Sequence, residues 1–238
     1  MADTALRVTR GEGPPQLFIY DEIGPGWLGL IDDVAVLDAL DDIGETEEIV
    51  VRLNSPGGDV FIGNSIANAF RRFDARIVME IDSLAASIAS VIAMSGDDIR
   101  IADNAMMMVH ESWTFALGNK RELADVVGRL GKVDGLILDA YVNRTGQPRA
   151  DLEKLIEAET WMTAQEAIDL GFADKLISST DTAAAIPEHL KFRNIPDRLA
   201  AAVYRRKFMK RRGRGFPDRD SQSYPNIADV LQRRQERT

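Results

Sequence analysis

Apolar and polar positions follow two periods along residues 17–177, one typical of strands and the other of helices. Short apolar or β-branched runs predict strands at 17–20, 48–53, 76–81, 99–101, 106–109, 161–162 and 172–177. Apolar residues at helical spacing predict helices at 31–40, 62–73, 119–143 and 152–158. A further helix should begin at the capping-box pattern Thr163-Ala164-Gln165-Glu166 and end at Gly171. Strands that alternate with helices predict an α/β fold.

One stretch, residues 82–96, departs from amphipathic patterning because small and apolar residues occupy every side of it. Such a pattern predicts a buried helix, and Gly96 is a natural stop for it. Ser83, Ser87 and Ser90 fall inside the stretch, and buried hydroxyls need partners. Ser87 would lie near the helix N-terminus, where free N–H groups favour a developing anion. It is therefore either a packing residue or a nucleophile beside an oxyanion site.

Composition narrows the chemistry that this chain can perform. Its 238 residues can form one substantial core, so we expect one domain with extensions. The absence of cysteine excludes disulfides and thiolate chemistry, and the two histidines, His110 and His189, exclude a histidine-rich zinc site. We therefore expect no metal and no cofactor. Residues 1–16 lack the apolar core of a signal peptide, and no apolar stretch reaches 18 residues, so an intracellular protein without membrane association is expected.

Charge divides the chain into an acidic body and a basic end. The net charge is −9, yet residues 186–238 contain 14 Lys and Arg against 6 Asp and Glu. We expect a flexible arm at 1–16, one folded domain at 17–177 and a basic, partly helical extension at 178–238. The extension lacks the interleaved aromatic residues of a nucleic-acid platform, so we expect a solvated tail or a protein-docking segment.

Two predicted strand-to-helix turns carry residues suited to catalysis. Glycines at Gly57 and Gly58 let the backbone approach a ligand closely, and Ser87 lies in the second turn. One backbone N–H from each turn could converge on a single oxygen, as in an oxyanion hole. His110 follows a predicted strand, and a neutral imidazole beside a serine can accept its proton.

Five motifs in a fixed order then resemble the ClpP family of serine peptidases over residues 17–177. They are Asn54-Ser55-Pro56-Gly57-Gly58, Ala85-Ala86-Ser87, Met108-Val109-His110, Arg144-Thr145-Gly146-Gln147 and Thr163-Ala164-Gln165-Glu166-Ala167. The resemblance implies the ClpP/crotonase fold, a Ser–His–acid triad and homo-oligomeric stacked rings around a proteolytic chamber. By matching positions it implies that Ser87 is the nucleophile and His110 the base. The oxyanion-hole amides would be those of Gly58 and Ile88.

The third triad member departs from the family pattern. A gapless alignment from Thr145 to Trp161 places Glu159 where the family has aspartate. Because glutamate is one methylene longer, the histidine would have to lie slightly differently, or another acid would serve. Glu157 and Asp151 are the alternatives.

The residues after His110 indicate a subgroup. The segment Glu111-Ser112-Trp113 replaces the proline and glycines that tend to follow the histidine in housekeeping members. With Trp113, Gly118-Asn119 and residues 159–163, it resembles the ClpP-related head maturation proteases of tailed phages and prophages. That resemblance implies processing of scaffold and capsid proteins in the bacterial cytoplasm or inside a procapsid. The basic extension could then dock on scaffold, portal or shell.

Three other functions remain open from the sequence. The first is a housekeeping proteolytic subunit supplied with substrate by an unfolding ATPase. The second is a crotonase-like acyl-CoA enzyme, whose chemistry needs no Ser–His pair. The third is a catalytically silent assembly factor.

Overall fold

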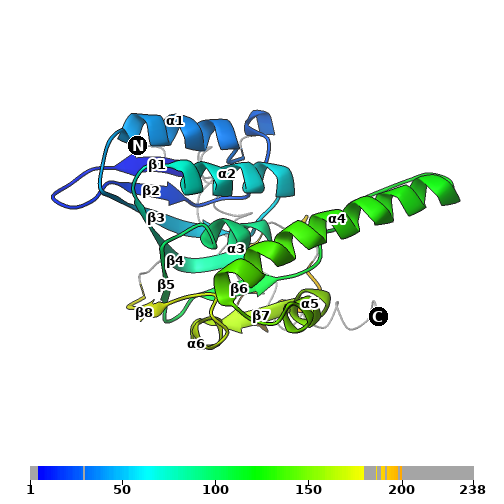
Figure 1. Cartoon of the computed structure of the whole chain (residues 1–238). Coiled ribbons are helices and arrows are strands. Elements are labelled where there is room, and N and C mark those ends of the chain that lie inside the picture. Colours follow the sequence, from blue (N-terminus) through cyan, green and yellow to red (C-terminus); the bar gives the residue numbers. More distant parts are fainter. Residues whose placement is uncertain are drawn as a thin grey trace, which may run out of the picture.

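The computed structural model describes residues 5–28, 30–179, 186, 189–190, 192–197 and 199 (Figure 1). The predictions for 1–4 and for most of the basic extension lie outside the described residues. Within them, strands and helices alternate along the chain, so the predicted α/β class is confirmed.

An eight-stranded sheet forms the centre of the fold. The strands are β1 (Leu6–Thr9), β2 (Gln16–Ile19), β3 (Glu48–Ser55), β4 (Arg76–Ala86), β5 (Asp98–Ala102), β6 (Met106–Val109), β7 (Thr160–Thr163) and β8 (Lys175–Ile177). Their order is β1-β2-β3-β4-β5-β8, parallel except for the antiparallel pair of β1 and β2. The last residues of β4 pair with β6 instead, and β6 pairs antiparallel with β7.

The helices bury one face of this sheet. They are α1 (Asp33–Ile43), α2 (Val60–Arg72), α3 (Ile88–Ala93), α4 (Lys120–Thr145), α5 (Arg149–Glu157) and α6 (Ala164–Asp169), with a 3-10 turn at Gly26–Leu28. Successive strand residues point to opposite faces, so alternate apolar positions of β3 and β4 meet these helices. The shared core includes Val36, Leu40, Ile49, Val51, Leu53, Ile66, Phe70, Ile77, Met79 and Ile81.

Side-chain caps set the ends of several helices. Asp59 accepts from the amides of Phe61 and Ile62, which begins α2 directly after the Gly57-Gly58 turn. Asn119 and Glu122 form a capping box at the start of α4, and Gly146 ends it in the left-handed conformation. The capping box predicted at Thr163 and Glu166 is confirmed at the start of α6.

The buried helix expected over residues 82–96 is wrong for its first part. Strand β4 continues to Ala86, and α3 covers only Ile88–Ala93. Sheet pairing explains the difference: Ala85 lies opposite Ser55 on one side and opposite Met107 on the other. Small residues fit between two neighbouring strands as well as they fit a buried helix, so the pattern alone could not separate the two.

The flexible arm expected over residues 1–16 is also wrong in part. Leu6–Thr9 forms β1, which pairs antiparallel with β2 from Leu6 opposite Ile19 to Thr9 opposite Gln16. Four residues are too few for a clear period, and Gly11, Gly13, Pro14 and Pro15 form the connection between the two strands. Pairing with a neighbouring strand, rather than local pattern, orders this segment.

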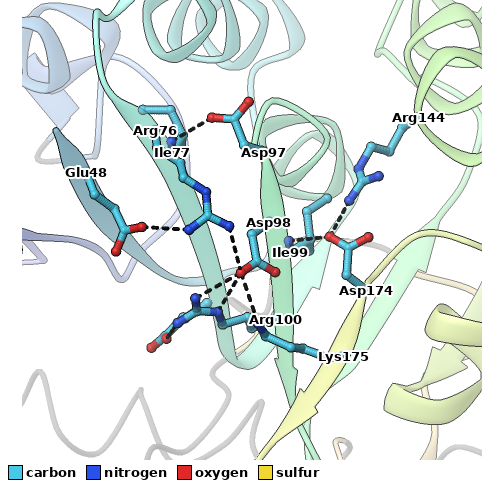
Figure 2. Close-up of polar contacts among 11 residues, drawn as sticks. Glu48, Arg76, Ile77, Asp97, Asp98, Ile99, Arg100, Arg144, Asp174 and Lys175 are labelled. Atoms are coloured by element: carbon cyan, nitrogen blue, oxygen red, sulfur yellow. Dashed lines mark hydrogen bonds and ion pairs between the residues drawn. The ribbon is translucent and has the colours of Figure 1, made fainter.

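Charged side chains cross the opposite face of the sheet (Figure 2). Asp98 on β5 accepts hydrogen bonds from Arg100 and from Lys175 of β8, and it pairs with Arg76 of β4 at 3.4 Å. Arg76 also bonds Glu48 of β3 at 2.7 Å. Burial acts to raise the pKa of Asp98, but the hydrogen bonds and charges of Arg100 and Lys175 outweigh it and hold that pKa below its usual range. The network therefore connects four neighbouring strands through one ionised carboxylate.

Helix α4 is only half covered. Its C-terminal part buries Ile137, Leu138 and Tyr141, whereas Leu123 and Val127 in its first half are exposed. Figure 1 shows that this first half projects beyond the body of the domain. The helix predicted over 119–143 is confirmed, but within a single copy of the chain its apolar stripe packs over part of its length.

Candidate active site

Ser87 occupies a strained turn between β4 and α3. Its backbone has φ 55° and ψ −130°, a left-handed conformation that residues with a side chain rarely adopt. Its amide donates to the carbonyl of Met108 at 2.9 Å, which fixes the turn against β6. A serine on a strained strand-to-helix turn presents its hydroxyl at the edge of the sheet.

Two buried hydroxyls support this turn from behind. Ser90 Oγ donates to the carbonyl of Ser87 at 2.6 Å and lies 2.8 Å from the Tyr141 hydroxyl. Burial raises the pKa of Tyr141, so its hydroxyl stays protonated. The sequence indicated that a buried Ser90 hydroxyl would need a partner, and it placed Tyr141 within the predicted helix 119–143 without assigning it a role. A hydroxyl on the buried stripe of α4 was the signal that could have indicated this contact.

The Gly57-Gly58 turn lies directly against Ser87. A Cβ added to Gly57 would lie 2.7 Å from Cβ of Ser87 and 3.2 Å from the amide nitrogen of Ile88. The neighbouring segment holds Gly58 in place, because Ile23 donates to the carbonyl of Gly57 and accepts from the amide of Asp59. In this parallel bridge the N–H of Gly58 itself points away from Ile23.

His110 lies at the end of β6 with its ring next to the serine. His110 Nε2 is 2.8 Å from Ser87 Oγ, a hydrogen-bond distance. The pairing of β4 with β6 produces this contact, since Ala86 lies opposite Met108 two residues before the histidine. The structure therefore brings together the two residues that the sequence predicted as nucleophile and base.

Glu159 is buried near the histidine, and its charge acts on the ring. The residue is 3% exposed and has a positive φ of 51°, which marks a constrained position between α5 and β7. Within the described part of the chain, no hydrogen bond or ion pair joins its carboxylate to His110. Glu159 instead accepts from the amide of Asn194 at 2.6 Å and from the indole of Trp161 at 3.4 Å.

The charges around His110 distinguish the candidate acids. Burial lowers the pKa of His110, Glu159 acts to raise it, Arg193 to lower it and Asp134 to raise it, with a net value below the usual one. Asp151 pairs with Lys154 at the surface, and Glu157 is exposed on the same helix. Of the three predicted acids, Glu159 is therefore the one whose charge acts on the His110 ring. Asp134 on α4, which the sequence did not indicate, is a second carboxylate that acts on it.

A low pKa for His110 predicts a specific pH profile. Because the base must be neutral, acylation should rise with pH and reach half its maximum below the value of about 6.5 typical of an unperturbed histidine. In Glu159→Gln the loss of the negative charge should move this midpoint to still lower pH. Stopped assays of kcat/KM between about pH 4.5 and 8 measure both midpoints. A midpoint that stays fixed in Glu159→Gln would contradict the electrostatic role of Glu159.

Other candidate features of the sequence lie outside this centre. His189, the second of the two histidines, lies 2.9 Å from Glu22. Among the described residues, no group of three or more His, Asp or Glu side chains is arranged to hold a metal ion. In the same ranges, no helix has both the length and the apolar character needed to cross a bilayer.

The sequence model of the Clp protease family matches residues 17–180, which is more than half of the chain. The chain belongs to the Clp protease family. A Clp protease proteolytic subunit 1 from Protochlamydia amoebophila, named as ATP-dependent, is 29% identical over 168 residues, which cover 69% of this chain and 81% of that protein. The corresponding subunit of Chlamydia caviae is 31% identical over 139 residues, which cover 57% and 73%. The proteolytic subunit of Deinococcus radiodurans is 30% identical over 149 residues, which cover 62% and 73%.

Membership of this family identifies the chain as a serine-type peptidase. The predicted resemblance to the ClpP family is therefore confirmed at the level of the family. These three relatives carry the name of the ATP-dependent Clp subunit, which agrees with the housekeeping alternative and gives no support to the phage subgroup.

Proposed function

We propose that the chain is a serine endopeptidase in which Ser87 is the nucleophile and His110 the general base. The observation that carries the proposal is the 2.8 Å distance between His110 Nε2 and Ser87 Oγ on a strained turn. Such a pair transfers the hydroxyl proton to the ring as Oγ attacks the peptide carbonyl. The ring then gives this proton to the leaving amine, and water hydrolyses the acyl-enzyme along the reverse path.

The amides of Gly58 and Ile88 would hold the oxyanion of the tetrahedral intermediate. Support comes from the contact between the two turns and from the N–H of Gly58, which points away from Ile23. Ile88 is the first residue of α3, so its amide has no acceptor within that helix. Glu159 would act on the imidazolium through its charge rather than through a direct hydrogen bond.

The biological role that the relatives favour is a proteolytic subunit supplied with substrate by an unfolding ATPase. Self-association into rings is consistent with the exposed first half of α4 and with the loop before it. That loop exposes Trp113, Phe115 and Leu117, and a set of large exposed apolar side chains indicates a protein contact. A second copy of the chain is the partner that we propose for this surface.

Head maturation of a phage is the second candidate. The Glu111-Ser112-Trp113 flank of the histidine and the basic composition of 178–238 favour it, because an acidic scaffold could bind that extension. A crotonase-like acyl-CoA enzyme is disfavoured by the Ser87–His110 contact, which its chemistry does not need. Cleavage that depends on Ser87 would exclude a catalytically silent assembly factor.

A degradation assay with two substrates tests the role. We expect the purified chain to cleave an unfolded protein such as reduced casein without ATP. We expect it to degrade a stably folded substrate only with an unfolding ATPase of the same organism and ATP. Ser87→Ala serves as the inactive control in both reactions. Selective cleavage of a co-expressed scaffold or capsid protein, with no stimulation by the ATPase, would contradict the housekeeping role and support head maturation.

A further inference from the structure

A segment beyond the matched family region lies against the candidate active site. The family match ends at residue 180, and the described residues between 186 and 199 contact the ends of β4, β6 and β7. Ile186, Phe192 and Leu199 are buried there in an apolar cluster with Leu84, Ala86, Met106 and Met108. This cluster includes Ala86, which precedes Ser87, and Met108, which lies two residues before His110.

Phe192 packs on the ring of the candidate base. The two rings meet edge to face, with centroids 5.6 Å apart and planes at 81°. Phe192 also meets Trp161 of β7 edge to face, at 5.7 Å and 80°. A buried ring that contacts both side chains limits how far His110 can rotate away from Ser87, and it excludes water from the part of the imidazole that it covers.

The next two residues hold the candidate acid. The backbone N–H of Asn194 donates to Glu159 Oε1 at 2.6 Å, and its side-chain amide donates to the carbonyl of Ala158 at 3.0 Å. The Nε of Arg193 lies 3.7 Å from Glu159 Oε2. These contacts fix the carboxylate behind the histidine and provide its buried charge with a hydrogen-bond donor and a cationic neighbour.

The described residues of this segment leave the nucleophile without a polar contact from the extension. None of its described residues makes a hydrogen bond or an ion pair to Ser87, and Ser87 remains half-buried while the residues on either side of it are buried. Its contacts with the catalytic candidates fall on the base and the acid: Phe192 meets His110, and Arg193 and Asn194 meet Glu159. This distribution distinguishes a support of the site from a plug that blocks it.

We propose that residues 192–194 are positioning residues of the peptidase, with Phe192 fixing the His110 ring and Arg193 and Asn194 fixing Glu159. The inference rests on the proposed function of Ser87 and His110. It assigns to the start of the C-terminal extension a role in positioning the base and the acid, in place of the tail or docking role expected from composition.

Substitution of Phe192 in the full-length chain tests this proposal, with Leu199→Ala as the matched control. Leu199 is buried in the same cluster but makes no ring contact with His110. For a short peptide substrate we expect Phe192→Ala to lower kcat by roughly tenfold or more and to change KM by less than about twofold. The midpoint of the pH profile should rise, because burial holds the pKa of His110 low. In Leu199→Ala, kcat and the midpoint should stay at their wild-type values.

Arg193 provides a second variant that does not depend on packing, because its side chain is largely exposed. Of the charges facing His110, Glu159 and Asp134 raise its pKa and Arg193 lowers it. Arg193→Gln should therefore raise the midpoint of the pH profile at low ionic strength. Arg193→Lys keeps the positive charge, so its midpoint should stay close to the wild-type value. If Phe192→Ala does not fold, the midpoints of Arg193→Gln and Arg193→Lys test the proposal in its place.

Three results would overturn the proposal. Faster turnover in Phe192→Ala would show that the segment masks the site, and kinetics like those of Leu199→Ala would show that it only packs. An unchanged midpoint in Arg193→Gln would count equally against it. Activity that survives in Ser87→Ala would instead refute the proposed function itself, so the two failures are distinguishable.

Discussion

Replacing Ser87 with alanine should lower kcat/KM for peptide cleavage by roughly 10⁴-fold or more. The variant lacks the oxygen that would form the acyl-enzyme, and His110 then has no proton to accept at 2.8 Å. The fold should persist, because alanine tolerates the backbone angles of this turn about as well as serine does. The amide that donates to Met108 is also unchanged. We expect the free energy of unfolding to change by about 1 kcal/mol or less.

Ser95→Ala is the matched control for this substitution. Ser95 is also buried, and its hydroxyl donates to the carbonyl of Ile92 at 2.6 Å without contacting His110. Its removal should leave kcat/KM close to that of the wild type. If Ser87→Ala and Ser95→Ala retained equal activity, Ser87 would be a packing residue of the turn.

Substitution of Gly58 by alanine should have the second largest effect. Gly58 has φ 142°, and an added Cβ would lie 1.9 Å from the carbonyl oxygen of Ile23, so the turn would have to move. Displacing its amide from the oxyanion should lower kcat by at least about 100-fold, which is typical for the loss of one such donor. Because the oxyanion exists only in the transition state, KM should change far less than kcat.

Gly11→Ala is the control for the chemical change itself. Gly11 lies between β1 and β2, and a Cβ added there would meet no described heavy atom within 4 Å beyond its chain neighbours, so the methyl group enters open space. We expect no change in kcat for this variant. Circular dichroism and thermal unfolding of Gly58→Ala then show whether its fold remains. A folded Gly58→Ala enzyme with wild-type kcat would contradict the oxyanion role of that amide.

Much of the fold was predictable because local pattern and tertiary environment agree there. The β-branched run of β3, the capping boxes at Asn119 and Thr163, and the stop at Gly146 each determine an element through its own residues. In contrast, pairing with neighbouring strands decided β1 and the last residues of β4. Those contacts join residues that are distant in sequence, so the local pattern of apolar residues cannot predict them.

In the candidate site, too, part of the arrangement could be predicted from the sequence and part could not. The proximity of Ser87 and His110 was expected from the order of the motifs, and the pairing of β4 with β6 accounts for it physically. Spacing did single out Glu159, whose charge acts to raise the pKa of His110, but it could not show that, within the described residues, no hydrogen bond joins the two side chains. Phe192 escaped notice because the extension has a basic composition, although Ile186, Leu190, Phe192, Ile195 and Leu199 form a sparse apolar pattern within it.

Covalent labelling tests the central claim, that Ser87 is the nucleophile activated by His110. A fluorophosphonate reacts when a serine Oγ forms a bond to phosphorus, fluoride leaves and the hydroxyl proton passes to the base. Mass spectrometry of the digested, labelled protein should find one adduct, on the peptide that contains Ser87, and His110→Ala should slow its formation greatly. An active enzyme that carries the adduct on another serine, or that is not labelled at all, would contradict the account.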